Sequence, residues 1–326
     1  GRVSAAPWSP EDPRLYVLVV ELKRDGETVD RYATQIGFRT VEVDPTGPSI
    51  LLNGEPRRFK GVARHEEDPP TGGSDVGKRP EDPPTGGLSA PGRGRVSDKI
   101  SLLRTTADLV KMRRDFGADF LRSGHYPNHW DVPILCDRLG IALWEEIPVF
   151  WFGGWEFDIQ RDRRGVARQM FLEAAYRDMN RPSLIIRGSV NECSAQEERR
   201  AFLKDLRDWG RRIDGTRLFG QSAAANDVRD PTHTVCDIVG FTSYFGVFYG
   251  RNRSYYEDTR AGLRDIASSF PGKPLIATEF GIWSETTGRN EREQCEVAVE
   301  TYRAFRENRA VAGTVWWTWA DWHTMI

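Results

Sequence analysis

Eight short apolar runs, most of them separated by segments of helical periodicity, constrain the fold more than any other feature of this chain. The runs are RRFKGVA (57–63), ADFLRS (118–123), IALWEEIP (141–148), SLIIRGS (183–189), RLFGQS (217–222), DIVGFTSY (237–244), KPLIATEFG (273–281) and AGTVWWTW (312–319). Helical periodicity lies in 105–117, 132–140, 167–180, 195–213, 257–270 and 291–308. This alternation predicts an α/β fold, a (β/α)8 TIM barrel. The chain stops at Ile326, soon after the eighth run, so we expect the last helix to be missing.

The first 44 residues have a different pattern, that of β-structure alone. LYVLVVEL (15–22) is followed by an Asp-Gly turn and by VDRYATQIGFRTVEV (29–43). Two or three strands do not form a stable domain by themselves. We therefore expect residues 1–44 to be the C-terminal part of an immunoglobulin-like β-sandwich and residues 45–326 to form the barrel. Asn53-Gly54 predicts a hairpin at the entry to the barrel.

The segment 66–98 lacks periodic apolar residues and is rich in proline, glycine and charge. The sequence EDPPTGG occurs in it twice, at 67–73 and at 81–87. The segment predicts a long loop after the first barrel strand. A tolerated duplication in a surface loop is the favoured interpretation, and a lid over the barrel mouth is the alternative.

Charge and hydropathy exclude several classes of partner. Lys plus Arg number 46 and Asp plus Glu 48, a formal net charge of -2, so no charge excess indicates nucleic acid or an anionic membrane surface. No stretch of 18 apolar residues predicts a membrane span. The four cysteines form no CxxC pair, which argues against a zinc site or a disulfide framework and predicts a reducing, cytoplasmic location.

Two glutamates end predicted barrel strands. Glu192 follows the fourth strand, and Glu279 ends the seventh, 87 residues later, or three units of 29. A barrel of about 250 residues averages about 31 residues per unit, so the spacing fits. The carboxyl ends of barrel strands carry the chemistry, and strands four and seven face each other. We therefore expect the two carboxylates to converge on one site.

A pair of converging carboxylates suits the hydrolysis of glycosides. One carboxylate attacks the anomeric carbon, and the other, protonated, donates to the leaving oxygen. A gap of about 5–5.5 Å gives retention of configuration and about 6.5–9.5 Å gives inversion, and the sequence leaves both open. The alternative for either glutamate is a simple ion pair with an arginine. Eleven tryptophans are compatible with a sugar site, although composition alone favours a large core.

An ordered set of motifs resembles glycoside hydrolase family 2, the group of β-galactosidases, β-glucuronidases and β-mannosidases. The motifs are IGFRTVEV (36–43), LLNGEPRRFKGVARHE (51–66), FLRSGHYPN (120–128), LCDRLGIALWEEIP (135–148), NRPSLIIRGSVNE (180–192), KPLIATEFG (273–281) and WWTWADW (316–322). The resemblance covers nearly the whole chain. It implies a retaining mechanism in which Glu279 is the nucleophile and Glu192 the general acid/base.

The same resemblance implies a set of sugar-binding residues. Asn191 would bond the 2-hydroxyl of the sugar, Arg122 would keep Glu279 ionised, and Tyr244 would donate to Glu279. The remaining implied contacts are His65, His125 and Trp317, the last beneath the sugar ring. For each histidine alone, a purely structural role is an equal alternative. Trp316 and Trp319 are expected in the core. Trp144 and Trp151 could line a leaving-group site, with core packing favoured.

Several positions depart from the family pattern. Arg187-Gly188 stands where Trp-Ser is usual, Thr242 where asparagine is common, and GHYP (124–127) where SHYP is usual. A charged Arg187 near the barrel interior needs a partner, or the strand register differs from the one predicted. The duplicated loop, directly after RHE (64–66), also bears on where His65 and Glu66 lie.

We expect an exo-β-glycosidase acting on a terminal β-galactoside or β-glucuronide, with a carbohydrate substrate as partner and no nucleic acid or membrane. CDIVGFTSYFG (236–246) and WTWADWHT (317–324) resemble the β-glucuronidase branch. Mannosidase specificity, or an inert or carbohydrate-binding fragment, stays open as an alternative. No metal or cofactor is expected, and formation of a homo-oligomer stays open.

Overall fold

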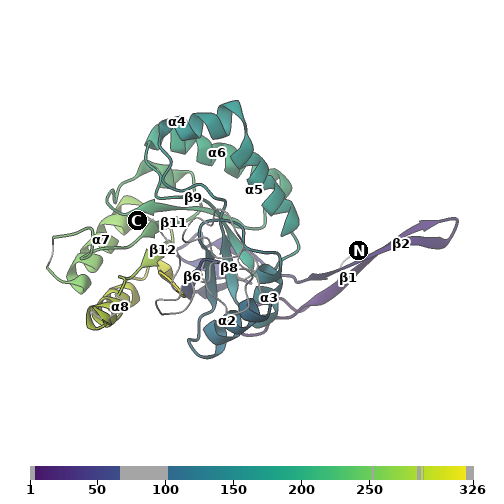
Figure 1. Ribbon diagram of the computed structural model, residues 1–326, viewed down its shortest axis with the longest axis horizontal. Coiled ribbons are helices and arrows are strands. Elements are labelled where there is room, and N and C mark those ends of the chain that lie inside the picture. The colour runs from purple at the N-terminus through teal and green to yellow at the C-terminus, as the bar shows by residue number, and fades with distance from the viewer. Residues whose placement is uncertain (1–3, 67–101, 252, 285–287, 289, 321–326) are drawn as a thin grey trace, which may run out of the picture.

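The computed structural model describes residues 4–66, 102–251, 253–284, 288 and 290–320. Eight parallel strands close into a barrel in the order β6 to β13, with β13 paired to β6 (Figure 1). The strands are β6 (Phe59–Arg64), β7 (Phe120–Ser123), β8 (Ala142–Glu145), β9 (Leu184–Asn191), β10 (Leu218–Ala224), β11 (Val239–Thr242), β12 (Leu275–Phe280) and β13 (Val311–Trp316). The predicted TIM barrel and all eight of its strands are confirmed.

Helices surround the barrel and pack on it through one apolar face. They are α2 (Leu102–Arg114), α3 (Asp131–Leu139), α5 (Val166–Arg177), α6 (Gln196–Ile213), α7 (Tyr255–Ser269) and α8 (Glu291–Glu307), each at a predicted place. In α6, for example, Phe202, Leu203 and Leu206 are buried at helical spacing. Between β10 and β11, where no helix is predicted, the chain forms a short 3-10 turn, η2 (Pro231–Thr234).

One helical segment was not predicted. After β8 the chain forms α4 (Gly154–Phe157), which continues into a π-helical turn, η1 (Asp158–Arg163). Two adjacent glycines, Gly153 and Gly154, open this segment, and glycine favours neither strand nor helix. Phe157 alone is buried from this segment, so it lacks the apolar stripe by which the other helices were found.

The centre of the barrel is filled by one indole, that of Trp144, in space that three glycines leave free. An added Cβ at Gly188 of β9 would lie 2.3 Å from its Nε1 atom. An added Cβ at Gly220 of β10 or Gly240 of β11 would lie 2.9 Å or 2.7 Å from its Cη2 atom. Glycine at these three positions is therefore what allows Trp144 to be fully buried, as the favoured core interpretation expected.

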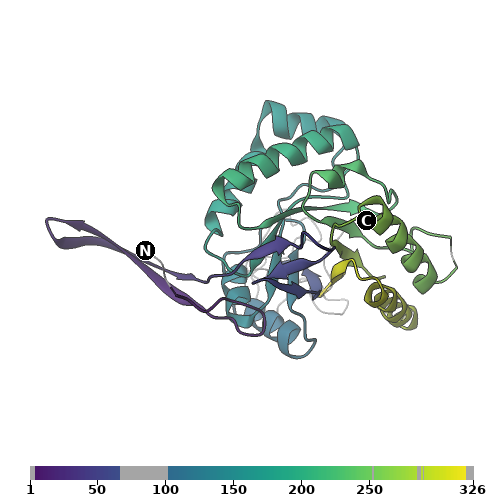
Figure 2. The same cartoon turned by 180° about the vertical axis from the view of Figure 1, so that it is seen from behind.

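Two small antiparallel sheets precede the barrel. β1 (Tyr16–Arg24) and β2 (Glu27–Ile36) form a hairpin that projects from the body of the molecule (Figure 1). β3 (Val41–Val43), β4 (Ile50–Leu52) and β5 (Glu55–Arg57) form a second sheet, at the centre of Figure 2. Ile50 and Leu52 of this sheet are buried in one cluster with Phe59 and Trp8.

The turns of both sheets follow the prediction. Asn53 and Gly54 between β4 and β5 have φ of 56° and 81°, and Asp25 and Gly26 between β1 and β2 have φ of 54° and 87°. The immunoglobulin-like assignment and the limits 1–44 and 45–326 stay predictions. The loop prediction for 66–98 falls almost entirely outside the described residues.

Arg187 has the partners that its charge requires. It forms ion pairs of 3.4 Å with Glu145 and with Asp214, and its Nη2 donates to the carbonyl of Ala175 in α5 at 3.1 Å. The side chain therefore lies between the strand and the outer helices, and Gly188 is the residue that faces the barrel interior. The predicted register of this strand holds.

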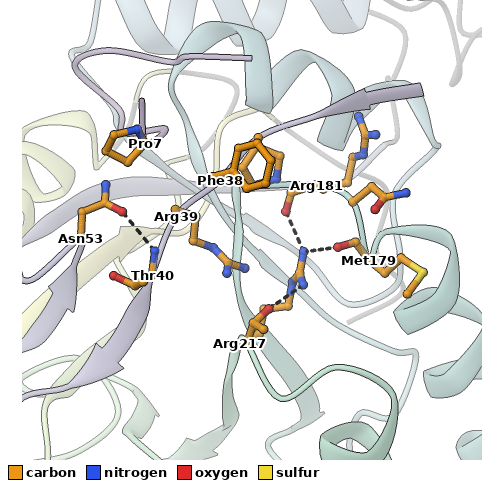
Figure 3. Close-up of a pocket in the computed structure, with 12 residues that line it drawn as sticks. Pro7, Phe38, Arg39, Thr40, Asn53, Met179, Arg181 and Arg217 are labelled. Atoms are coloured by element: carbon orange, nitrogen blue, oxygen red, sulfur yellow. Dashed lines mark hydrogen bonds between the residues drawn. The ribbon is translucent and has the colours of Figure 1, made fainter. Parts of the chain in front are cut away.

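A cavity of about 460 Å³ lies at the amino-terminal end of β9 and β10, between the barrel and the N-terminal segment (Figure 3). Arg217 donates across it to the carbonyls of Met179 and Arg181, and Arg39 donates to the carbonyl of Leu184. Arg39 thereby attaches the N-terminal segment to the barrel. The predicted catalytic residues lie at the opposite, carboxyl-terminal end of the barrel, on β12 and directly after β9.

Two global features complete the description. No helix in the described part of the chain is long and apolar enough to cross a membrane. The four cysteines are unpaired, with Cys136, Cys193 and Cys236 buried and Cys295 exposed.

Candidate active site

The two predicted catalytic glutamates lie at the carboxyl end of the barrel. Glu279 is part of β12, and Glu192 directly follows Asn191, the last residue of β9. The backbone of Glu192 is left-handed, with φ of 47°, and its N–H donates to the carbonyl of Ser222 in β10 at 2.8 Å. A left-handed backbone is unfavourable for a residue with a Cβ and is found preferentially at functional sites.

Glu279 is buried and held by two donors. Its Oε1 accepts from Nη1 of Arg122 at 2.7 Å, and its Oε2 accepts from the hydroxyl of Tyr244 at 2.8 Å. Burial raises the pKa of this carboxyl, Arg122 and His125 oppose that rise, and the charge of Glu192 adds to it, so that the pKa lies above its ordinary value. The predicted contribution of Arg122 thus has the expected sign but is outweighed by burial.

Glu192 has different neighbours. Its Oε1 accepts from the hydroxyl of Thr242 at 2.7 Å, and its Oε2 accepts from Nε1 of Trp151 at 3.2 Å. Both donors are neutral, and within the described residues Glu192 forms no salt bridge. Thr242 is also the register partner of Glu279 on the neighbouring strand. Thr242, which stands where asparagine is common, is thus a hydrogen-bond donor to Glu192 and a neighbour of Glu279 in the sheet.

Arg122 links the two sides of the site. This guanidinium is fully buried on β7, and besides Glu279 it contacts Oδ1 of Asn191 at 2.7 Å. It also forms two hydrogen bonds with Glu146, of 2.8 Å from Nε and 3.1 Å from Nη2. One rigid cation thus orients the predicted nucleophile and the predicted sugar-binding amide together.

Aromatic rings form a wall beside Arg122. His125 stacks on Trp317 with 5.1 Å between ring centroids and 9° between planes, and His65 meets the same indole edge-on at 5.3 Å. Burial, together with the nearby His125 and Arg122, lowers the pKa of His65 to about 3, so this ring is neutral at ordinary pH. The structure brings His65, His125 and Trp317 together, and Nε2 of His125 lies 3.8 Å from Oε1 of Glu279. The contacts of these three residues with a sugar stay predictions.

Two residues of the site were missed or misjudged from the sequence. Core packing was favoured for Trp151, but this side chain is 57% exposed and touches Glu192, so that interpretation is wrong. Trp151 belongs to an irregular segment that pairs with the end of β9: the N–H of Asn191 donates to the carbonyl of Val149, and the N–H of Trp151 donates to the carbonyl of Asn191. Glu146 was not considered, although the sequence held a signal for it. Side chains alternate between the two faces of a strand, so of the adjacent Glu145 and Glu146 in LWEEIP one must face outside the barrel and the other inside.

The two core assignments for tryptophans at the end of β13 hold. Trp316 and Trp319 pack against buried clusters, and Trp319 meets Phe116 edge-on at 5.1 Å. Among the described side chains, no group of three or more His, Cys, Asp or Glu residues is arranged to hold a metal ion.

Known proteins of similar sequence span two activities. A β-galactosidase of Thermoanaerobacter pseudethanolicus is 28% identical over 65% of this chain and 24% of its own length. A β-glucuronidase of Streptococcus agalactiae is 26% identical over 98% of this chain and 53% of its own length. The chain therefore spans between about a quarter and about half of these relatives.

Solved structures have the same fold. A β-galacturonidase from Eisenbergiella tayi, bound to galacturonate, superposes with a TM-score of 0.79 at 23% identity, over 96% of this chain and 52% of that one. A β-D-glucuronidase from Dictyoglomus thermophilum superposes with a TM-score of 0.78 at 23% identity, over 98% of this chain and 54% of that one. At this identity the likeness is one of fold.

Sequence families give the assignment. The family described as glycosyl hydrolases family 2 matches residues 3–39, and its TIM barrel domain matches residues 89–324. The second match covers most of the chain and includes β7 to β13 with both strand-end glutamates. The chain belongs to glycosyl hydrolases family 2.

Proposed function

We propose that this chain is the catalytic barrel of a retaining exo-β-glycosidase that hydrolyses terminal β-galactosides or β-glucuronides. One observation carries the proposal. Glu279 is bound by a cation and a phenol, whereas Glu192, also at the barrel mouth, is bound by two neutral donors and has a left-handed backbone. Two carboxylates in such different surroundings suit two different roles.

In the first step Glu279 is the nucleophile. Its carboxylate attacks the anomeric carbon while Glu192 gives its proton to the glycosidic oxygen, and the bond to the leaving group breaks. The sugar is then an ester of Glu279. Arg122 and Tyr244 disperse the negative charge of the carboxylate before attack and when it is released again.

In the second step the roles reverse at Glu192. The Glu192 carboxylate takes a proton from water, the water oxygen bonds to the anomeric carbon, and the ester bond to Glu279 breaks. Asn191, which Arg122 orients, is placed to bond the 2-hydroxyl, an interaction that strengthens in an oxocarbenium-like transition state. Trp317 offers an apolar face to the sugar ring.

A fluorosugar that traps the covalent ester tests the mechanism. We expect 2-deoxy-2-fluoro β-glycosides with a good leaving group to inactivate the protein and to label Glu279, identified by mass spectrometry of the peptide. Labelling of Glu192 instead would reverse the roles. Turnover without any trapped ester would contradict retention, and absence of both turnover and labelling would favour the inert or carbohydrate-binding alternative.

The sugar is decided by a separate comparison. We expect a panel of nitrophenyl β-glycosides to show preference for the galactoside or the glucuronide over the mannoside. CDIVGFTSYFG favours the glucuronide, whereas the similar proteins include enzymes named for both sugars. A clear preference for mannoside would leave the mechanism intact and contradict the proposed specificity.

A further inference from the structure

The proposed reaction leaves one buried carboxylate of the site, that of Glu146, without a role. Its side chain is 2% exposed, and both oxygens are fully bonded. Oε1 accepts from Nε1 of Trp144 at 2.7 Å and from Nε of Arg122 at 2.8 Å. Oε2 accepts from Nη2 of Arg122 at 3.1 Å and lies 2.8 Å from Nδ1 of His125. Glu146 thus contacts Arg122 and His125, two of the residues that lie against Glu279.

Residues of the barrel core hold the Glu146 carboxylate in place. Trp144, its donor, is fully buried and packs closely against Gly188, Gly220 and Gly240, where an added Cβ would lie 2.3, 2.9 and 2.7 Å from the indole. The backbone N–H of Glu146 also donates to the hydroxyl of Ser123 at 2.9 Å. Glu146 is therefore a rigid attachment point between the barrel core and the site.

Glu146 is ionised in these surroundings. Burial acts to raise its pKa, but the charge of Arg122 and the hydrogen bond from His125 outweigh burial, and the pKa lies below its ordinary value. An ionised carboxylate only accepts hydrogen bonds, so its 2.8 Å contact with Nδ1 of His125 is a hydrogen bond only when that nitrogen carries the proton. Nη2 of Arg122 also lies 3.2 Å from Nδ1 and would donate to it in the other tautomer, but this contact is the longer of the two, so the geometry favours the Nδ1–H form. In the neutral ring Nε2 is then the unprotonated nitrogen, and it lies 3.8 Å from Oε1 of Glu279.

We propose that Glu146 is a positioning residue that selects the Nδ1–H tautomer of His125 and locks the Arg122 guanidinium between Glu279 and Asn191. The expected effect of Glu146 on the labelling rate rests on the proposed function, whereas the tautomer of His125 does not. The lone pair of His125 Nε2 then faces the reacting space, where it can accept a hydroxyl of the sugar, and Glu279 keeps the orientation needed for attack.

The tautomer is measurable without any substrate. The chain has five histidines, so selective ¹⁵N-histidine labelling gives a simple NMR spectrum, and loss of one signal pair in His125→Gln assigns the ring. At a pH above which the ring signals no longer change, we expect the Nδ1 atom of wild-type His125 to carry the proton. A protonated Nε2 would overturn the proposal whatever the variants do.

The isosteric variant Glu146→Gln tests the positioning. Its amide N–H₂ group would donate toward Nδ1 of His125, so the ring should change to the Nε2–H tautomer. Fluorosugar labelling of Glu279 should slow by on the order of 10- to 100-fold, as expected for a nucleophile misplaced by a fraction of an ångström. An unchanged tautomer or an unchanged labelling rate would overturn the proposal.

Two further variants separate positioning from folding. Glu145→Gln removes the adjacent buried carboxylate, which pairs outside the barrel with Arg177 and Arg187, and should leave both the His125 tautomer and the labelling rate unchanged. Trp144→Phe keeps a ring in the glycine-lined space but removes the N–H donor, and should slow labelling less than Glu146→Gln does. A wild-type protein that is not labelled at Glu279 would contradict the proposed function and leave the tautomer result standing.

Discussion

The hydroxyl of Thr242 and the indole of Trp151 are the donors to Glu192, and neither carries charge. The proposed general acid can therefore give up its proton to the leaving oxygen without separating an ion pair. This is the residue-level feature that distinguishes it from Glu279, which shares a hydrogen bond with a buried guanidinium. Variants of each glutamate should accordingly fail in different ways.

Replacing Glu192 should lower kcat/KM mainly for substrates whose leaving group must be protonated. In Glu192→Gln we expect kcat/KM for a methyl glycoside to fall by on the order of 100-fold or more, because its leaving group must be protonated. A dinitrophenyl glycoside, whose leaving group departs as the anion, should lose much less in its first step. Equal losses on both substrates would show that Glu192 does not protonate the leaving group.

Replacing Tyr244 by phenylalanine should shift the pH profile of kcat/KM. The pKa of Glu279 is raised by burial, and the hydroxyl of Tyr244 opposes this rise because it donates to the ionised form. Since Glu279 must be ionised to attack, kcat/KM falls as the pH drops through this pKa. Tyr244→Phe removes the donor, so the acid limb should move to higher pH, by about 1 unit. A limb that stays in place or moves to lower pH would contradict this assignment.

Strands β9, β10 and β11 each contribute a glycine to the space around Trp144. The energetic coupling between such a glycine and the indole can be measured. Gly220→Ala should cost about 1–3 kcal/mol in unfolding free energy, because the new Cβ overpacks the indole. In a Trp144→Phe background the same change should cost clearly less, since the phenyl ring lacks the Cη2 atom that lies 2.9 Å away. Denaturant unfolding of the double-mutant cycle measures the difference. Additive costs would show that the indole and the glycine are not coupled.

The regular elements were predictable because their signal is periodic. Strand–helix alternation located all eight strands, and glutamates at two strand ends indicated the site. Glu146 was not found because its role depends on which side of the barrel its side chain faces. With Glu145 directly before it, the sequence alone did not show which of the two glutamates faces the interior. Trp151 was misjudged because its position is set by backbone pairing of Val149 and Trp151 with Asn191, which lies about 40 positions further along the chain. Long-range pairing of an irregular segment leaves no local pattern to read.

At the scale of the whole molecule, the β1–β2 hairpin contrasts with the closed barrel. A barrel has no free strand edges, whereas this hairpin projects from the body of the molecule (Figure 1) and each of its two strands leaves one edge unpaired. Val20 and Tyr32 are cross-strand partners, 52% and 63% exposed, and Leu22 on the same face is 62% exposed. An exposed apolar ribbon of this kind favours pairing with another chain.

We therefore expect the 326-residue chain to associate through the hairpin as its concentration rises. Changing the cross-strand pair to polar residues, Val20→Lys with Tyr32→Thr, should reduce the association measured by light scattering or sedimentation. The unfolding free energy of the barrel should stay within about 0.5 kcal/mol, as for other exposed positions. Val299→Thr, at an exposed apolar position on α8, is the matched control and should not change association. Association that persists in the hairpin variant would place the contact elsewhere on the molecule, and a wild-type chain that stays monomeric at high concentration would show that the hairpin does not drive self-association.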